Sequence, residues 1–365
     1  MAITEAIPAE LRQELLALCA AIPPPDVSAA GAAQRRLDQL TKPPGSLGML
    51  EDLILRLAAI TGAVCPTIAA PAVLVAAGDH GVVAEQISPY PQAVTGQMVL
   101  NFLSGGAAIN ALAANAGARV IVVAAGVAHD FPDHPDLVQL HCGAGTHNLR
   151  QRAAMTQAEA ARILLQGAAL IQRQHAAGLD LLALGEMGIG NTTVAACLTS
   201  AFTGAPAEQT TGRGTGLDDA GVIHKRAVVA AAIARVQPDP TDPLRILAEL
   251  GGFELAVLTG AALAAAARRI PIVLDGYVAT AAALVAAALA PAVQPYLIAG
   301  HRSAEPGHRI ALAHLELHPI LQLDMRLGEG SGAALAIPIL QGALRVMRNM
   351  ATFTQAGVDN RPDQP

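Results

Sequence analysis

The sequence predicts an α/β protein in which a mostly parallel sheet is flanked by helices. Short aliphatic runs, each ending in glycine or a polar residue, recur along the chain at 72–81, 119–127, 179–186, 271–276 and 295–301. Unbroken runs of this kind are typical of strands that are buried on both faces, as in parallel sheets. Longer segments with helical character separate them, for example 94–116, 156–177 and 217–235. Because strands alternate with helices, the pattern indicates the α/β class.

The composition favours a large core and excludes several classes of function. Of the 365 residues, 53% are hydrophobic but only 2% are aromatic, and Trp is absent. A chain of this length can bury a large core in one large domain or in two. The net charge is −6, and few aromatic side chains are available for base stacking, so nucleic-acid binding is not expected.

The four cysteines predict neither a disulfide framework nor a zinc site. They are widely scattered, with no Cys-x-x-Cys pair and no Cys/His spacing typical of a metal site. The four are Cys19, Cys65, Cys142 and Cys197. Residues 1–10 contain two acids and no apolar run of the signal-peptide type. We therefore expect a reduced, cytoplasmic setting.

One uncharged stretch, 276–294, is long enough by itself to span a membrane. It is rich in alanine, contains Pro291 and follows the strand-like run 271–275. These features favour a buried crossover helix of an α/β fold over a membrane span.

The two ends of the chain predict a smaller helical subdomain beside the sheet. Residues 1–65 have helical periodicity with a proline-rich break at 23–26, and residues 330–354 again have helical character. We expect these two segments to pack together beside an α/β domain of residues 66–329. Residues 355–365 are polar and contain proline, which predicts a flexible tail.

The run GEMGIGNTT at 185–193 carries the strongest signal for chemistry. It lies between an aliphatic run and a helical segment, which predicts a glycine-rich turn between a strand and a helix. Backbone N–H groups in such a turn, together with a helix N-terminus, can bind an anion. The run lacks both the lysine of a P-loop and the glycine spacing of a dinucleotide-binding turn. An acid inside the turn, Glu186, points instead to catalysis or substrate recognition.

Polar side chains also gather at the predicted carboxyl ends of the strands, where ligands bind in open α/β sheets. They are Asp79, His80, Glu186, Asp275, His301 and Arg302. Singly, each has a structural alternative. Asp79 and Asp275 can equally cap a helix or fix a turn. His80 can be a structural histidine, and the residues at 301–302 can form a surface pair. The prediction of a site therefore rests on all six polar residues gathering at the strand ends, not on any one of them.

Two further glycine-rich segments supply candidate ligands. In 325–335, Glu329 lies between two glycines just before an apolar helix, so its carboxylate is expected to be accessible. The alternative is a helix N-terminal acid that the helix dipole favours. In 212–225, glycines alternate with polar residues before Lys225, which suits a phosphate. A mobile surface loop with an ordinary lysine explains that segment equally well.

Two polar loops are less specific. In 41–51, two prolines fix the backbone and Ser46 can cap the following helix. In 84–99, Ser88 and Gln97 can hydrogen-bond a heterocycle, or simply cap and line the start of a helix.

Seven of these segments follow one another across nearly the whole chain. They are KPPGSLG (42–48), GDHGV (78–82), SPYPQAVTGQMV (88–99), GEMGIGNTT (185–193), GGFELAVLTG (251–260), PIVLDG (271–276) and RLGEGSGAAL (326–335). In this order they resemble one family, the nicotinate-nucleotide:dimethylbenzimidazole phosphoribosyltransferases of cobalamin lower-ligand assembly. The resemblance implies a Rossmann-like sheet with a small helical domain, a homodimer, and no metal or other cofactor. It also implies transfer of 5-phosphoribose from nicotinate mononucleotide to 5,6-dimethylbenzimidazole, which gives α-ribazole 5′-phosphate and nicotinate.

The resemblance further implies roles for individual residues. The acid of RLGEGSG, Glu329, corresponds to the family's general base, and Glu186 corresponds to an acid in its active site. The family's phosphate-binding features match Gly188, Gly190, Asn191, Thr192 and Lys225. Its benzimidazole pocket matches Ser88, Gln97, Met187 and Leu327. Because the donor is β-configured and the product α-configured, the reaction is a single displacement with inversion that requires no covalent enzyme intermediate.

Two other functions remain open. A nicotinate-nucleotide glycohydrolase would use the same pocket with water as the acceptor, and Glu329 could activate that water. A non-catalytic protein that binds a nucleotide or a benzimidazole would keep only the fold. The presence of both acids and of the whole glycine turn weighs against this second alternative.

Overall fold

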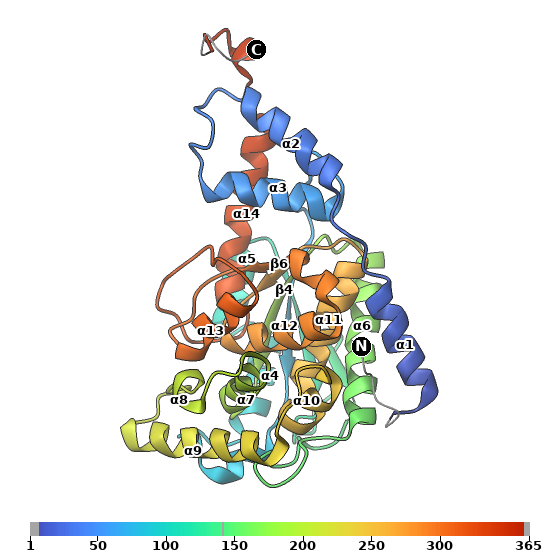
Figure 1. Cartoon of the computed structure of the whole chain (residues 1–365), viewed down its shortest axis with the longest axis vertical. Coiled ribbons are helices and arrows are strands. Elements are labelled where there is room, and N and C mark those ends of the chain that lie inside the picture. The colour runs from blue at the N-terminus through green and yellow to red at the C-terminus, as the bar shows by residue number, and fades with distance from the viewer. Residues whose placement is uncertain (1–6, 141, 361–365) are drawn as a thin grey trace.

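The computed structural model describes residues 7–140 and 142–360. Within these residues, six strands form one sheet in the order β3-β2-β1-β4-β5-β6, and each neighbouring pair is parallel (Figure 1). The strands are β1 (Pro71–Ala77), β2 (Arg119–Ala125), β3 (Leu137–Leu140), β4 (Leu181–Met187), β5 (Ile272–Leu274) and β6 (Leu297–Ala299). The predicted α/β class with a parallel sheet is confirmed.

Helices connect the strands and cover the sheet. The helices that precede β4 are α1 (Ala9–Ala20), α2 (Val27–Gln39), α3 (Met49–Thr61), η1 (Gly81–Glu85), α4 (Val94–Leu103), α5 (Ala108–Asn115) and α6 (Gln157–Ala176). Those that follow β4 are α7 (Asn191–Thr203), α8 (Ala207–Thr210), α9 (Asp219–Val236), α10 (Pro243–Leu250), α11 (Phe253–Ala267), α12 (Tyr277–Leu289), η2 (Pro291–Tyr296), α13 (Pro306–His314), α14 (Ser331–Asn349) and α15 (Phe353–Ala356).

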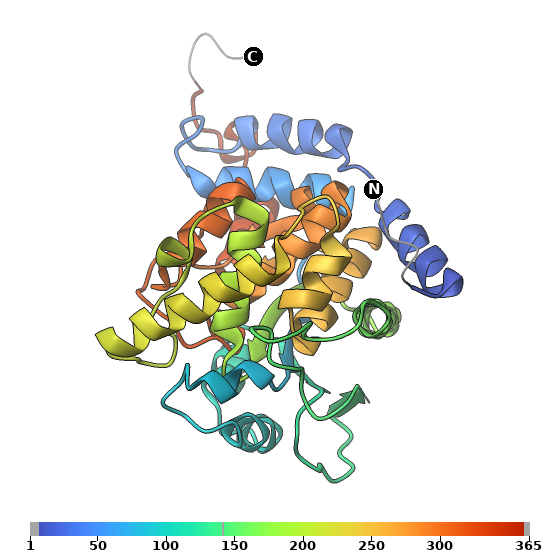
Figure 2. The ribbon, with the colours of Figure 1, turned by 60° about the horizontal axis from the view of Figure 1, so that its bottom comes forward.

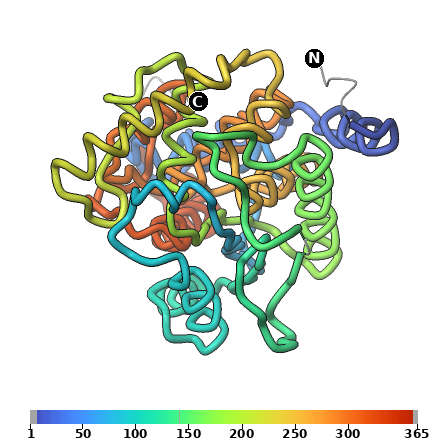
Figure 3. The backbone as a smooth tube through the Cα atoms, turned by 90° about the horizontal axis from the view of Figure 1, so that it is seen from below, coloured from blue at the N-terminus to red at the C-terminus, as the bar shows by residue number. Residues whose placement is uncertain are grey.

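The two faces of the sheet have separate apolar cores. Along β1, Val73 and Val75 pack with α4, α5 and α14, whereas Leu74 and Ala76 pack with α6, α11 and α12. The views in Figures 2 and 3 show α6 (green) well apart from the pair α4 and α5 (cyan). Since both faces are covered, the inner strands are aliphatic over most of their length, and this explains why they could be predicted from unbroken runs.

Two glycines allow α6 and α11 to pack backbone against backbone. A Cβ at Gly260 would overlap the carbonyl oxygen of Leu164, and one at Gly167 would overlap that of Val257. Any larger residue at these two positions would force the helices apart. This close contact fixes the helical layer over one face of β1, β2 and β4.

Two elements differ from the sequence prediction. The edge strand β3 was not predicted, because three of its four residues are only half-buried and its apolar pattern is correspondingly weak. The continuous helical segment expected over 94–116 is instead two helices, α4 and α5. The chain turns between them at Gly105, whose φ of +78° lies in the left-handed region that ends helices.

The terminal helices contact different parts of the molecule. Helices α2 and α3 pack on each other and on α14, and the Arg36 side chain donates to the carbonyl of Met347 at 2.8 Å. In contrast, α1 lies against α6 and α11 (Figure 1). The proposed subdomain of residues 1–65 and 330–354 stays a prediction. Residues 1–6 of that segment and 361–365 of the predicted tail lie outside the described residues.

Two apolar stretches resemble membrane spans by composition. The stretch predicted as a crossover helix is α12, whose side chains are almost all buried within the fold. The stretch Val94–Asn115 also has the length and hydropathy of a span. It is divided into α4 and α5, of 10 and 8 residues, and each is far shorter than the roughly 20 residues that a span requires.

Candidate active site at the carboxyl edge of the sheet

A small cavity of about 90 Å³, which we call the inner pocket, lies where β4, β5 and β6 end. It is lined by residues 186–189, Asn191, Thr192, Gly214, Thr215, 276–278, His301, Ser303, Glu305 and 326–328. Three sequence motifs that are far apart in the chain therefore meet here: the glycine turn after β4, the loop before α9 and the RLGEGSG run before α14. Of the six strand-end residues that were expected to converge, Glu186 and His301 line this pocket.

The glycine turn joins β4 to α7 as expected. Gly190 has a φ of +97° and directly precedes the first residue of α7, so the N-terminal N–H groups of that helix face the turn. Gly188 lies so close to the carbonyl oxygen of Gly78 and to the His80 ring that a Cβ would overlap the carbonyl. The turn is thus held against β1, and its N–H groups at the helix N-terminus form a suitable anion site.

Lys225 lies behind this turn, not in the pocket wall. Its side chain is 1% exposed, and its Nζ donates to Thr192 Oγ1, an atom of a lining residue, at 2.7 Å. Burial lowers the pKa of Lys225 from 10.5 to about 8, and the nearby Glu305 carboxylate opposes this shift. Lys225 is therefore an almost fully desolvated cation that lies one hydrogen bond behind the candidate anion site at the glycine turn.

Glu186 is an acid whose surroundings disfavour its charge. It is 7% exposed and accepts a hydrogen bond from the Asn191 side chain. Burial raises its pKa well above 4.5, and the carboxylates of Asp275, Glu254 and Glu329 raise it further, whereas the Asn191 hydrogen bond lowers it. The result is a carboxyl group in the pocket wall that is held toward its protonated form.

Glu329 is held in a strained backbone conformation. Its φ is +65°, and its neighbours Gly328 and Gly330 have φ values of +86° and +83°. A left-handed residue other than glycine costs roughly 1–2 kcal/mol, and such strain is concentrated at functional sites. The segment is fixed because the Glu329 N–H donates to the carbonyl of Glu186 at 3.1 Å, and because Gly185 leaves room for the 329–330 backbone.

The Glu329 carboxylate is less accessible than the sequence predicted. The residue is 6% exposed and is not among those that line the inner pocket, although Gly328 beside it is. Its Oε2 is buried without a hydrogen-bond partner among the described residues. Burial and the Asp275 carboxylate raise the pKa of Glu329, while the Ile109 N–H in the first turn of α5 lowers it.

Asp275, not Glu329, caps α14. Its carboxylate accepts from the N–H groups of Gly332 at 2.6 Å, Gly330 at 3.1 Å and Ala333 at 3.2 Å. His301 Nε2 lies 3.4 Å from the same carboxylate. The structural alternative for Asp275 is thus realised, and this cap is what fixes the RLGEGSG run against the end of β4.

The other strand-end residues also have structural partners. Asp79 accepts from the Ala128 N–H at 2.7 Å and so fixes the turn after β2. His80 and Glu254 form an ion pair at 2.8 Å that is fully buried. Burial alone would lower the pKa of His80, but the carboxylates of Glu254 and Asp79 outweigh it and raise that pKa. Arg302 does not line the inner pocket.

The residues assigned to a benzimidazole are only partly brought together. Met187 and Leu327 line the inner pocket, Leu327 being 55% exposed. Ser88 Oγ lies 2.9 Å from Oγ1 of Thr215, which is a lining residue. Gln97 is exposed on α4, and neither it nor Ser88 is in the lining.

Sequence analysis missed several polar residues of the pocket wall, among them Arg326, Ser303 and Glu305. Arg326 belongs to the RLGEGSG run that was singled out, so the motif itself held the signal. Ser303 and Glu305 follow the strand end at His301, and their position after β6 was the only sign. The Ser303 N–H donates to His308 Nδ1 at 2.9 Å, and burial lowers the pKa of His308 from 6.5 to about 3. A neutral histidine therefore orders this loop.

Comparisons with known proteins agree with this geometry. A family described as "Phosphoribosyltransferase" matches residues 22–358. The chain is 53% identical over 340 residues to a nicotinate-nucleotide–dimethylbenzimidazole phosphoribosyltransferase of Chloroflexus aurantiacus, covering 93% of this chain and 97% of that one. It is 52% identical over 326 residues to the protein of the same name from Thermus thermophilus, covering 89% and 97%. The crystal structure of CobT from Thermus thermophilus superposes with a TM-score of 0.89 at 51% identity, covering 92% of this chain and 100% of that one.

Proposed function

Since the chain belongs to the nicotinate-nucleotide–dimethylbenzimidazole phosphoribosyltransferase family, and is thus a phosphoribosyltransferase, we propose that it transfers 5-phosphoribose from nicotinate mononucleotide to 5,6-dimethylbenzimidazole. The products are α-ribazole 5′-phosphate and nicotinate. The observation that carries the mechanism is the pair of buried carboxyl groups, Glu186 and Glu329, whose pKa values are both raised beside an anion cradle. A general base works best when its pKa lies near the operating pH.

The phosphate of the donor is bound at the glycine turn. The N-terminus of α7 begins there, Thr192 lines the inner pocket, and Lys225 supplies positive charge through Thr192. Gly188, Gly190 and Asn191 complete this cradle. Binding energy from the phosphate, which does not react, is used to align the anomeric carbon with the acceptor.

The acceptor heterocycle lies against Met187 and Leu327, on the side of the inner pocket where Glu186 is located. Ser88 reaches this wall through Thr215. The acceptor ring nitrogen attacks the anomeric carbon while the bond to nicotinate breaks, with inversion. The positive charge that develops on the acceptor is removed when its other nitrogen loses a proton to Glu329.

Glu329 is suited to accept this proton for two structural reasons. Its Oε2 has no competing hydrogen-bond partner among the described residues, and its position is fixed by the strained backbone between two glycines. Glu186, in contrast, is hydrogen-bonded by Asn191 and held toward its protonated form, which suits it to donate a hydrogen bond to the acceptor.

We also propose that the protein is a homodimer and works in the cytoplasm. The support for a dimer is the low burial of the apolar stretch Val94–Asn115, since only 28% of its 18-residue apolar window is buried within the single chain. A second copy that covers α4 would also change the surroundings of the exposed Gln97. Sedimentation equilibrium of the full chain at several concentrations measures the oligomeric state.

A product assay tests the reaction. The protein is incubated with nicotinate mononucleotide, with and without dimethylbenzimidazole, and products are resolved by mass. We expect equal amounts of nicotinate and α-ribazole 5′-phosphate, and neither product without acceptor. Nicotinate release without acceptor would identify a glycohydrolase. Nucleotide binding without either product would identify a non-catalytic binding protein.

A further inference from the structure

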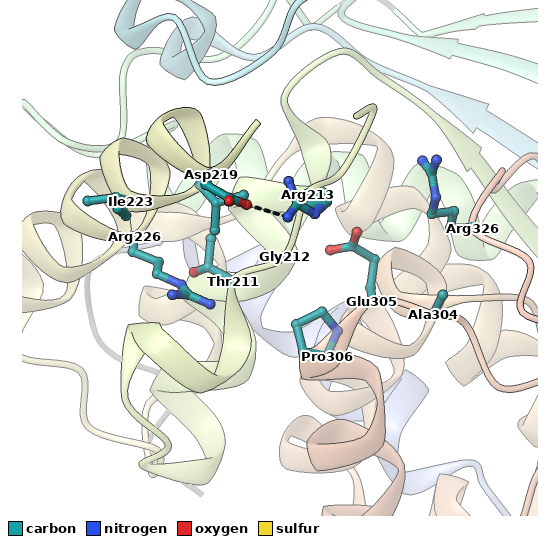
Figure 4. A pocket seen from close by; sticks show the side chains of 11 residues that line it. Thr211, Gly212, Arg213, Asp219, Ile223, Arg226, Ala304, Glu305, Pro306 and Arg326 are labelled. Carbon is teal, nitrogen blue, oxygen red and sulfur yellow. Dashed lines mark hydrogen bonds and ion pairs between the residues drawn. The ribbon is translucent and has the colours of Figure 1, made fainter. Parts of the chain in front are cut away.

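Two of the seven motifs that run through the chain have no part in the proposed reaction. GDHGV (78–82) follows β1, and GGFELAVLTG (251–260) includes the start of α11. The fold brings them together in the fully buried ion pair of 2.8 Å between His80 Nε2 and Glu254 Oε1. Neither residue lines the inner pocket or the neighbouring cavity of about 510 Å³, which Figure 4 shows around Glu305 and Arg326. The pair therefore acts on a ligand in these cavities only through other residues.

The ion pair lies directly behind the glycine turn. A Cβ at Gly188 would lie 3.1 Å from His80 Nε2, and one at Gly190 would lie 3.5 Å from His80 Cβ. The backbone of the turn thus packs against the imidazole side chain. A second contact to the turn comes from α4, where Thr95 Oγ1 accepts from the Ile189 N–H at 3.1 Å. The turn is held by α4 at one residue and by His80 at the residues on either side of it.

Two further glycines make room for the pair. A Cβ at Gly78 would lie 2.6 Å from Glu254 Oε2. A Cβ at Gly252 would lie 2.5 Å from the same oxygen and 2.5 Å from His80 Cε1. Gly78 also ties the end of β1 to β4, because its N–H donates to the carbonyl of Met187 at 3.0 Å. The pair is thus enclosed by the backbones of three motifs: the end of β1, the start of α11 and the glycine turn.

An ion pair is a costly way to fill a buried space. The desolvation of two charges offsets most of their attraction, and apolar side chains of similar volume are often as stabilising or more so. Burial alone would lower the pKa of His80, but the Glu254 and Asp79 carboxylates outweigh burial and favour the charged ring. A fixed geometry that function requires accounts for a pair of this kind.

We propose that His80 and Glu254 are positioning residues for the donor, and that their ion pair holds the glycine turn in the geometry that binds the donor phosphate. This inference rests on the proposed function. His80 acts through its contact with Gly188, and Glu254 acts through His80 by fixing the rotation of the imidazole ring. Without Glu254 the ring is free to rotate away from Gly188, and the N–H groups of the turn lose the alignment that a phosphate requires.

Two substitutions of Glu254 test this role. Glu254→Gln keeps the shape of the side chain and an oxygen that faces His80 Nε2. Glu254→Leu has a similar volume but no acceptor, and it leaves no unpaired carboxylate that would prevent folding. We expect KM for nicotinate mononucleotide to rise about tenfold or more in Glu254→Leu and to stay within about threefold in Glu254→Gln. In both variants kcat should stay within about threefold and KM for dimethylbenzimidazole within about twofold.

Two more variants complete the set. Gly252→Ala displaces the ring in a different way, because its Cβ would overlap His80 Cε1, and it should raise the same donor KM about tenfold. Glu249→Leu is the matched control. It removes a half-buried carboxylate from another ion pair, with Arg235 at 2.7 Å, and should change neither KM.

Calorimetric titration with nicotinate mononucleotide, without acceptor, repeats the comparison independently of turnover. Equal donor affinity of wild type, Glu254→Leu and Gly252→Ala would overturn the inference. Equal losses of affinity for donor and acceptor would also overturn it, because the pair would then support the fold as a whole. A tenfold loss of donor affinity in Glu254→Gln, as an order-of-magnitude bound, would overturn the role given to the ring contact, which this variant keeps. A wild-type protein that binds the donor but forms no α-ribazole 5′-phosphate would instead contradict the proposed function.

Discussion

Replacing Lys225 by methionine should stabilise the protein and weaken donor binding at the same time. Lys225 and Lys42 are the two lysines in the sequence, and both are buried. Lys42 Nζ pairs with Glu51 at 2.8 Å, whereas the one hydrogen-bond partner of Lys225 Nζ within residues 7–140 and 142–360 is the neutral Thr192 hydroxyl. The Glu305 carboxylate offsets only part of the cost of burying the Lys225 charge, and a buried charge of this kind lowers stability and is retained where function requires it.

The size of the stability effect follows from the pKa of Lys225. The decrease from 10.5 to about 8 corresponds to a cost of about 3 kcal/mol for holding the charged form in the folded state. Below about pH 8 Lys225 is protonated in both the folded and the unfolded protein, so the full cost of burying its charge lowers the free energy of unfolding. Between about 8 and 10.5 the unfolded state keeps the proton that the folded state has lost, so stability rises with pH. Above about pH 10.5 Lys225 is neutral in both states, and its contribution to the free energy of unfolding no longer changes with pH.

Lys225→Met removes this cost but also the hydrogen bond to Thr192. We therefore expect the free energy of unfolding at pH 7 to rise by about 1–3 kcal/mol, and its increase between pH 8 and 10.5 to shrink. Because hydrogen bonds to charged groups contribute about 1.5–3 kcal/mol, KM for nicotinate mononucleotide should rise roughly 10- to 150-fold. Urea unfolding at a series of pH values measures the first effect, and initial rates measure the second.

Lys42→Met is the matched control for Lys225→Met. It should lower the free energy of unfolding by about 1–3 kcal/mol, because the buried Glu51 carboxylate loses its partner. It should leave KM unchanged. A destabilised Lys225→Met variant would refute the argument from desolvation, and an unchanged KM would place Lys225 away from the donor phosphate.

Two further variants test the electrostatics of the site. The folded-state pKa of Glu186 is raised above 4.5, so the free energy of unfolding falls as pH rises from about 4.5 through that pKa. The urea concentration at the unfolding midpoint should therefore be higher for Glu186→Gln than for the wild-type protein at pH 7. At pH 4 the two midpoints should be similar. The reverse order at pH 7 would show that the Asn191 hydrogen bond outweighs burial. Asp275→Ala leaves three N–H groups at the start of α14 without an acceptor and should lower the free energy of unfolding by about 2–4 kcal/mol. A free energy of unfolding within about 0.5 kcal/mol of the wild-type value, measured by thermal or urea unfolding, would mean that water or another group replaces this cap.

The sheet was predictable because strands that are buried on both faces are encoded by continuous aliphatic runs, which are easy to find in a sequence. The strands β1, β2 and β4 each contain an aliphatic run of four or more residues, and the register of β1 with β4 pairs Ala76 with Glu186 at the edge where the polar residues begin. The edge strand β3 was missed since one side of it is open. The break between α4 and α5 was missed because a glycine at the end of a helix and one within it are alike in sequence.

The candidate site was predictable as a set of motifs but not as a surface. Strand ends brought the glycine turn and the RLGEGSG run together, since carboxyl ends of parallel strands share one edge. Accessibility depended on tertiary packing: Glu329 was expected to be open but is buried, and Lys225 is hidden behind Thr192. For Glu305 the only sequence signal was its position after β6, because its contact with the site comes from the loop before α9, whose Gly214 N–H donates to it.

The central claim is that Glu329 accepts the acceptor's proton, and the turnover number of Glu329→Gln tests it most directly. Glu316→Gln is a suitable control, because Glu316 also has a left-handed backbone, with a φ of +54°, but is exposed beyond α13. We predict that Glu329→Gln lowers kcat by about 10²–10⁴-fold while its unfolding temperature and donor KM stay close to those of wild type, and that Glu316→Gln changes none of these. A kcat for Glu329→Gln within about threefold of wild type, for a reaction that a general base accelerates far more than this, would contradict the account.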